Sequence, residues 1–136
     1  MPVITDHLPL ETVAIVEATA PDVHASRAAI VFRTWHYLDS EEARRLLFEE
    51  FVLDGRVLGL VEAIAATVHR GSWAGATPRS LIQALAQERT SFQAKVEHAL
   101  ILALNEVLGS LATTLVLNAW RQAYRFFMRQ LALHAA

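Results

Sequence analysis

The sequence predicts a single domain built entirely from α-helices. Along most of the chain, apolar residues recur at offsets of three and four rather than alternating, which is the period of a helix with one buried face. The 136 residues fall within the usual size of one domain, and no internal repeat, low-complexity tract or flexible linker divides them. One domain over residues 1–136 is therefore expected.

The N-terminal third is expected to hold three helices. A short helix over Thr12–Thr19 is predicted to end at Pro21, because proline disfavours helix at the residue before it and can open a new helix itself. The next helix then runs to about Tyr37. Asp39 followed by Glu42 has the spacing of a capping box, so a further helix is expected to begin there.

The middle of the chain has the most regular helical pattern. Its apolar stripe has the spacing i, i+3, i+4, i+7, i+11 and consists of Val57, Leu60, Val61, Ile64 and Val68. This helix is expected to end near Gly71. Thr77 and Pro78 then supply an N-cap and a proline at the first helical position, which predicts a short helix after them.

Two long helices are expected at the C-terminal end, from about Lys95 to Leu108 and from about Thr113 to Leu133, with a break at Gly109 and Ser110. Their apolar surface is broad, so they are expected to form the centre of the domain. The last helix carries an aromatic cluster of Trp120, Tyr124, Phe126 and Phe127. Core packing is the favoured interpretation of this cluster, and part of an oligomer interface is the alternative.

The composition argues against several classes of function. A formal charge of −2 gives no positive field that would attract nucleic acid, and the absence of cysteine excludes disulfides, thiolate nucleophiles and cysteine-ligated metals. The N-terminus does not have the pattern of a secretory signal. Asn105, Glu106 and Gly109 interrupt the most apolar region, so no membrane span is expected. The prediction is a cytoplasmic protein.

Catalytic chemistry is not indicated. The sequence shows no nucleophile–base pair, no glycine loop that would hold phosphate and no grouped set of metal ligands. The acidic pairs Glu41-Glu42 and Glu49-Glu50 are interpreted as caps and solvated surface, because adjacent residues of a helix point in different directions. An enzyme is therefore not expected.

Several segments carry a resemblance to a known family. They are Thr12–Pro21, Leu47-Phe48, Gly55-Arg56, Glu106–Gly109 and Val116–Tyr124, and the last contains the pattern Ala-Trp-x-x-Ala-Tyr. In this order and spacing they are similar to the globin domain of flavohaemoglobins and of single-domain bacterial globins. The resemblance extends from about Leu10 to about Leu133 and implies a globin-like fold of about seven helices.

The resemblance implies a haem pocket, but the residues that would hold haem do not match. Arg89 stands where the family has its proximal histidine, and a guanidinium stays protonated and cannot donate a lone pair to iron. The distal tyrosine and glutamine of the family align with Phe32 and with Val52 or Leu53. We therefore expect no cofactor, and a pocket lined by Phe32, Phe48, Val52 and Arg89.

Three functions remain open. The first is a haem-free globin-like protein that acts by binding, as a sensor, regulatory or protein-interaction module similar to the sensor globins of stressosome-type regulators. It would form a homodimer through Val96–Leu133 and would take a small apolar ligand or a fatty acid whose carboxylate pairs with Arg89. The second is a haem-binding globin for oxygen or nitric oxide with His98 as an unusual iron ligand. The third is a scaffold whose pocket is filled by side chains.

Overall fold

The structure is a computed structural model that describes residues 8–38, 41, 52–53, 56–57, 60–70 and 79–135. These residues form five α-helices and a 3-10 turn: α1 (Leu10–Ala25), α2 (Arg27–Tyr37), α4 (Leu60–Arg70), α5 (Arg79–Leu108), η1 (Gly109–Leu111) and α6 (Thr114–Ala135). Two short strands, β1 (Val52–Leu53) and β2 (Arg56–Val57), pair antiparallel with Val52 opposite Val57. Over the described ranges the predicted all-α class is confirmed, with this two-residue ladder as its β component.

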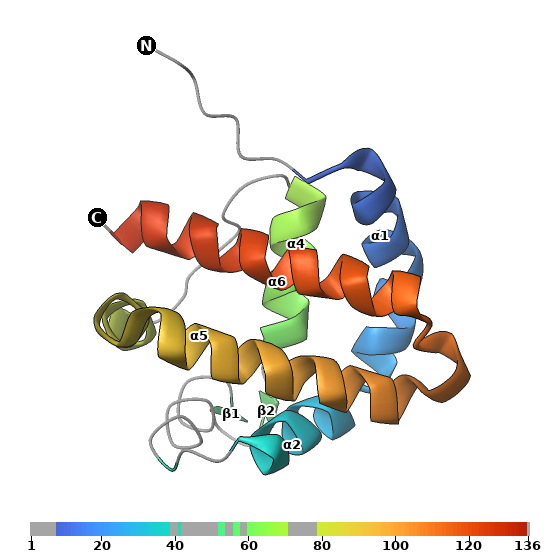
Figure 1. Ribbon diagram of the computed structural model, residues 1–136, viewed down its shortest axis with the longest axis horizontal. Coiled ribbons are helices and arrows are strands. Elements are labelled where there is room, and N and C mark those ends of the chain that lie inside the picture. Colours follow the sequence, from blue (N-terminus) through green and yellow to red (C-terminus); the bar gives the residue numbers. More distant parts are fainter. Residues whose placement is uncertain are drawn as a thin grey trace.

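The helices are arranged in two layers. α5 and α6 lie side by side across one face of the molecule, while α4 and α1 cross behind α6 and α2 packs against α5, below it in the view (Figure 1). The side chains between the two layers form one hydrophobic core. α1 is tied to α6 at one end, where the Thr12 hydroxyl donates a 2.9 Å hydrogen bond to Oε1 of Gln122. The position of α1 is therefore fixed by both α4 and α6.

Helix α1 continues through Pro21, contrary to the predicted end of the helix at that residue. A proline inside a helix removes one backbone hydrogen bond and costs about 3 kcal/mol. Val16 and Val23 lie seven residues apart on one face of α1, and each is only 1% exposed. Burying a valine side chain stabilises by about 1.5–3 kcal/mol, so the two valines together offset the proline. The chain instead turns at Ser26, and α2 ends at Tyr37 as expected.

The middle helix is shorter than its apolar stripe predicted. Val57 belongs to β2 and pairs with Val52, so α4 begins at Leu60 and ends at Arg70. Ile64 and Val68 are buried, as the stripe requires. The helix expected to begin at Asp39 and Glu42, and the cap expected at Thr77 and Pro78, lie outside the described residues.

The short helix after Pro78 and the helix from Lys95 are one continuous element, α5. No glycine or proline stands between Ser80 and Leu108, so nothing in the sequence forces the backbone out of helical conformation there. The first part of α5 is seen nearly end-on in Figure 1, whereas the rest runs across the view. The two helices predicted for this region are therefore one helix whose two parts run in different directions.

The predicted break at Gly109 is confirmed. Gly109 has a φ of +58°, in the left-handed region that glycine adopts without steric cost, and it is the first residue of η1, which precedes α6. This turn reverses the chain so that α6 runs back along α5 (Figure 1).

Replacing Gly109 with alanine is expected to lower the free energy of unfolding by about 1 kcal/mol. A Cβ added at this position meets no atom within 4 Å, so backbone strain is the whole cost. Urea unfolding of the Gly109→Ala variant measures it. Gly109→Asn is expected to lose less, because asparagine enters the left-handed region more readily. An alanine variant as stable as the original protein would contradict the left-handed turn.

The aromatic cluster of α6 belongs to the core, which confirms the favoured interpretation. The side chains of Trp120, Tyr124, Phe126 and Phe127 are each at most 1% exposed. Burial raises the pKa of the Tyr124 phenol well above its usual range, because the core cannot solvate a phenolate. These residues therefore hold the two helix layers together within one copy of the chain.

Candidate functional site

A cavity of about 660 Å³ lies between α1 and α4, with α6 beneath it. We call it the α1–α4 cavity. Its lining residues come from three helices and are Val16, Glu17, Ala20, Pro21, Val23, His24, Ala65, Ala66, His69 and Trp120. This volume falls within the range of small-molecule sites, about 300–1,000 Å³.

Small side chains leave this space open. Ala20 and Pro21 on α1 line it together with Ala65 and Ala66 on α4, and none of these residues has a long side chain to project across the gap. Val16 and Trp120 form the floor of the cavity, and their side chains are almost completely buried. The result is an apolar hollow with a closed base and a partly exposed upper edge.

The indole of Trp120 is held in one orientation at the base of the cavity. Its Nε1–H donates a 2.9 Å hydrogen bond to the hydroxyl of Thr19. That hydroxyl in turn donates to the carbonyl of Ile15 at 2.8 Å. Because the indole N–H and its partner are both satisfied, the ring can stay buried without an unpaired polar group. Trp120 therefore gives the cavity a rigid aromatic wall.

The rim of the cavity carries its polar groups. Oε1 of Glu17 lies 3.2 Å from Nδ1 of His69, which links α1 to α4 across the opening, and His24 adds a second imidazole. Pro21 has no amide hydrogen, so the carbonyl of Glu17 lacks the donor that a helix supplies four residues later. The Glu17 carboxylate thus places a hydrogen-bond acceptor at one edge of an apolar hollow.

Phe32, one of the residues predicted to line a haem-type pocket, is not among the residues that line this cavity. Phe32 is 65% exposed on the outer surface of α2, because Ile30, Val31 and Thr34 form the buried face of that helix. The expectation that Phe32 lines an enclosed pocket is therefore corrected. Val52 is part of β1 and Arg89 is part of α5, and their side chains, like the whole of Phe48, lie outside what the structure describes.

His98, the alternative iron ligand, is exposed on α5. The buried face of that helix is formed by residues such as Val96, Leu100 and Leu104, and His98 is directed away from it. It does not contribute to the α1–α4 cavity. Among the described residues, no three histidine, aspartate or glutamate side chains gather into a site that could hold a metal ion.

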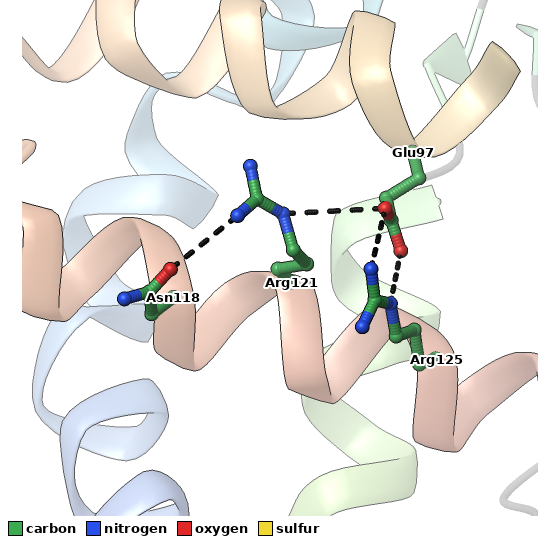
Figure 2. Close-up of polar contacts among 4 residues, drawn as sticks. All are labelled: Glu97, Asn118, Arg121 and Arg125. Carbon is green, nitrogen blue, oxygen red and sulfur yellow. Dashed lines mark hydrogen bonds and ion pairs between the residues drawn. The ribbon is translucent and has the colours of Figure 1, made fainter. Parts of the chain in front are cut away.

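A second polar cluster joins α5 to α6. Figure 2 shows Glu97 of α5 between two arginines of α6: Arg125 donates to both of its carboxylate oxygens, at 2.6 and 3.1 Å, and Nε of Arg121 lies 4.0 Å away. Arg121 also donates to Asn118 at 3.4 Å. The hydrogen bonds that the Arg125 guanidinium donates to Glu97 raise the pKa of that guanidinium. Because Glu97 already occupies the two guanidiniums, we interpret this cluster as a clamp between helices rather than an anion site.

The face through which a homodimer was expected has a mixed character. The exposed positions of α6 include Asn118, Gln122, Arg125 and Arg129, all polar. Leu102, Leu111 and Leu115 are the large apolar side chains left exposed near the turn between α5 and α6. The expected homodimer through Val96–Leu133 therefore stays a prediction.

The described part of the chain thus defines an all-α protein with an apolar, aromatic-floored cavity between two of its helices. Comparison of the chain with protein-family models, with curated proteins and with solved structures finds no match. None of the helices within the described ranges is long and apolar enough to cross a membrane.

The cavity was not found from the sequence. The available signal was the cluster of small residues, Ala20 and Pro21 in one helix and Ala65 and Ala66 in another. Small residues in a helix do not by themselves show that another helix faces them. Pro21 was interpreted as a helix end, which hid its place in the middle of a cavity wall.

Proposed function

We propose that this protein is a haem-free, globin-like binding protein that holds a small, largely apolar molecule in the α1–α4 cavity. The observation that carries the proposal is the cavity itself, with a volume of about 660 Å³, walls of small apolar side chains and a fixed tryptophan floor. Hollows of this size with few polar groups are where proteins bind small molecules.

The globin-like part of the proposal rests on the resemblance and on the way the helices pair. Globins pack their helices pairwise around a central pocket. Here α5 packs against α2 and α6, while α1 packs against α4 and α6, in keeping with that plan. Arg89, in the position that corresponds to the haem-ligand histidine, favours a protein that does not use haem.

The position of the cavity favours a sensor or regulatory role. A molecule bound there would contact α1 and α4 at once, and both helices pack against α6. Binding would therefore favour whichever spacing of α1 and α4 fits the ligand better, and α6 would carry that change to the rest of the domain. A ligand shifts such an equilibrium only by its difference in affinity for the two arrangements.

Cyclohexylmethanol, a neutral molecule with an apolar body, tests the binding proposal. Nuclear magnetic resonance titration is expected to show saturable shifts at the Trp120 indole N–H and at backbone amides near Ala66. Ala66→Leu should abolish these shifts, because the larger side chain occupies the cavity from an exposed position where it does not disturb the core. Ala14→Leu is the control, because Ala14 is an exposed helical alanine outside the cavity.

Two results would contradict this function. One is the absence of saturable shifts in the unmodified protein. The other is equal binding by the Ala66→Leu and Ala14→Leu variants, which would place the ligand elsewhere.

Hemin titration tests the haem-free part of the proposal. No saturable Soret band is expected, because Arg89 cannot ligate iron and His98 is exposed on the surface of α5. The measurement is the ultraviolet–visible spectrum of the unmodified protein and of His98→Ala. A band that saturates near one hemin per chain would overturn the haem-free assignment, and its loss in His98→Ala would identify the ligand.

A further inference from the structure

We propose that the ligand of the α1–α4 cavity is an organic ammonium, an apolar body that carries a protonated amine, and that Glu17 selects it. This inference rests on the proposed function, since it assigns the head group of the molecule that the cavity holds. It is carried by the charge, the acceptor groups and the aromatic wall of the cavity.

Among the described residues that line the cavity the formal charge is negative, because Glu17 is a carboxylate and none of the others is an acid, a lysine or an arginine. Glu17 stands at the exposed edge of the cavity, with its side chain 48% exposed, so its attraction for an opposite charge is modest and weakens as salt is added. An apolar ligand that enters with a positive head group gains this attraction, whereas a negative head group is repelled.

The acceptors of the rim match the donors of an ammonium. One carboxylate oxygen of Glu17 faces His69, yet a carboxylate has about four acceptor positions, so it can take a second donor at the same time. An ammonium has three N–H groups and no acceptor, and is the complement of such an edge.

The tryptophan floor suits the apolar body of such a ligand. Trp120 is 0% exposed, so it contributes apolar surface to the base of the cavity rather than an open ring face. Trp120 is held in place by Thr19, so it does not have to be ordered when the ligand binds. Apolar walls, a carboxylate and a fixed indole together are suited to an alkyl or cycloalkyl amine.

This cavity does not suit the fatty acid expected from the sequence. That expectation depended on Arg89 as the partner of the carboxylate, and the side chain of Arg89 lies outside what the structure describes. In the α1–α4 cavity a fatty-acid carboxylate would instead lie close to Glu17. Of a positive, a neutral and a negative head group, the negative one would therefore bind least tightly.

Three probes of the same shape separate the head groups: cyclohexylmethylamine, cyclohexylmethanol and cyclohexanecarboxylate. Affinities are measured by magnetic resonance titration at about pH 8, where an ordinary histidine is neutral and an alkylamine is charged. The amine is expected to bind about tenfold more tightly than the alcohol, and the carboxylate more weakly than either. A tenfold preference corresponds to one charge-assisted hydrogen bond at a partly exposed site.

Glu17→Gln is expected to remove most of this preference and to bring the amine to the affinity of the alcohol. Glutamine has nearly the same size and helix propensity as glutamate, so α1 should be preserved. Glu11→Gln is the matched control, because Glu11 lies on the same helix but outside the cavity, and it should keep the preference. His69→Gln should keep it too, since Glu17 retains its charge.

The outcomes separate the two proposals. Equal binding of amine and alcohol, or an amine preference that survives in Glu17→Gln, overturns the ammonium assignment while leaving the cavity a ligand site. Tightest binding of the carboxylate overturns it as well. Failure of all three probes to bind overturns the proposed function, and the ammonium assignment with it.

Discussion

Replacing Trp120 with alanine is expected to lower the free energy of unfolding by about 3–5 kcal/mol, the range for removing a large aromatic side chain from a core. Trp120 is 0% exposed and packs where α6 meets α1. The variant also loses the hydrogen bond from the indole to Thr19. Because domains of this size are stable by only about 5–15 kcal/mol, a large share of the variant is expected to unfold at moderate temperature.

Urea unfolding followed by circular dichroism measures this effect, and Trp35 provides the matched control. Trp35→Ala makes the same substitution at a tryptophan whose side chain is 37% exposed on α2. Its loss is expected to be clearly smaller, since less apolar area returns to water. Similar losses for the two variants would contradict the placement of Trp120 in the core and of α6 at its centre.

Replacing Leu104 with alanine is expected to lower the free energy of unfolding by about 2–5 kcal/mol. Leu104 is 0% exposed on the face of α5 that belongs to the core, so the shorter side chain leaves an internal hollow that the surroundings fill only in part. Chemical unfolding curves with an unchanged slope give the loss directly.

Leu102, two residues away on the same helix, is the control for Leu104. It is 36% exposed, and Leu102→Ala is expected to cost about 1 kcal/mol or less. Comparing Leu104→Ala with Leu102→Ala tests which face of α5 is turned toward the core. Rotating the helix about its axis would bury Leu102 and expose Leu104. A larger loss for Leu102→Ala than for Leu104→Ala would show that α5 presents a different face to the core.

Much of the fold could be predicted from the sequence where the signal is local. The left-handed turn at Gly109 and the burial of Ile64 and Val68 both follow from the chemistry or spacing of residues close in the chain. The aromatic cluster of α6 also predicted a core, because such large apolar surfaces are costly to leave in water.

The errors arose where a local preference competed with packing. Pro21 disfavours a helix, but α1 keeps its helical conformation because Val16 and Val23 share one buried face. Phe32 was expected to line a pocket because it aligns with the distal tyrosine of the family that the sequence resembles. It is exposed because the buried face of α2 is already formed by its neighbours Ile30 and Val31.

The candidate site could not be predicted in the same way. The sequence contains Glu17 and His69 in separate helices, and nothing near either residue indicates that they meet. Their 3.2 Å contact exists because α1 and α4 pack against each other. The residues that were predicted to line a pocket came instead from the resemblance to globins, and Phe32 among them does not line this cavity.

The sequence by itself determined that the chain forms helices. It also determined at which point of the chain the last two helices are separated, and which side of α4 and of α6 is apolar. These properties depend on backbone constraints and on a period within one helix. Only the tertiary structure decided that α1 passes through Pro21, that Phe32 faces outward and that a cavity lies above Trp120. The physical reason is that the space between two helices depends on the side chains that both contribute where they meet, and distant parts of the sequence come together there only when the whole core packs.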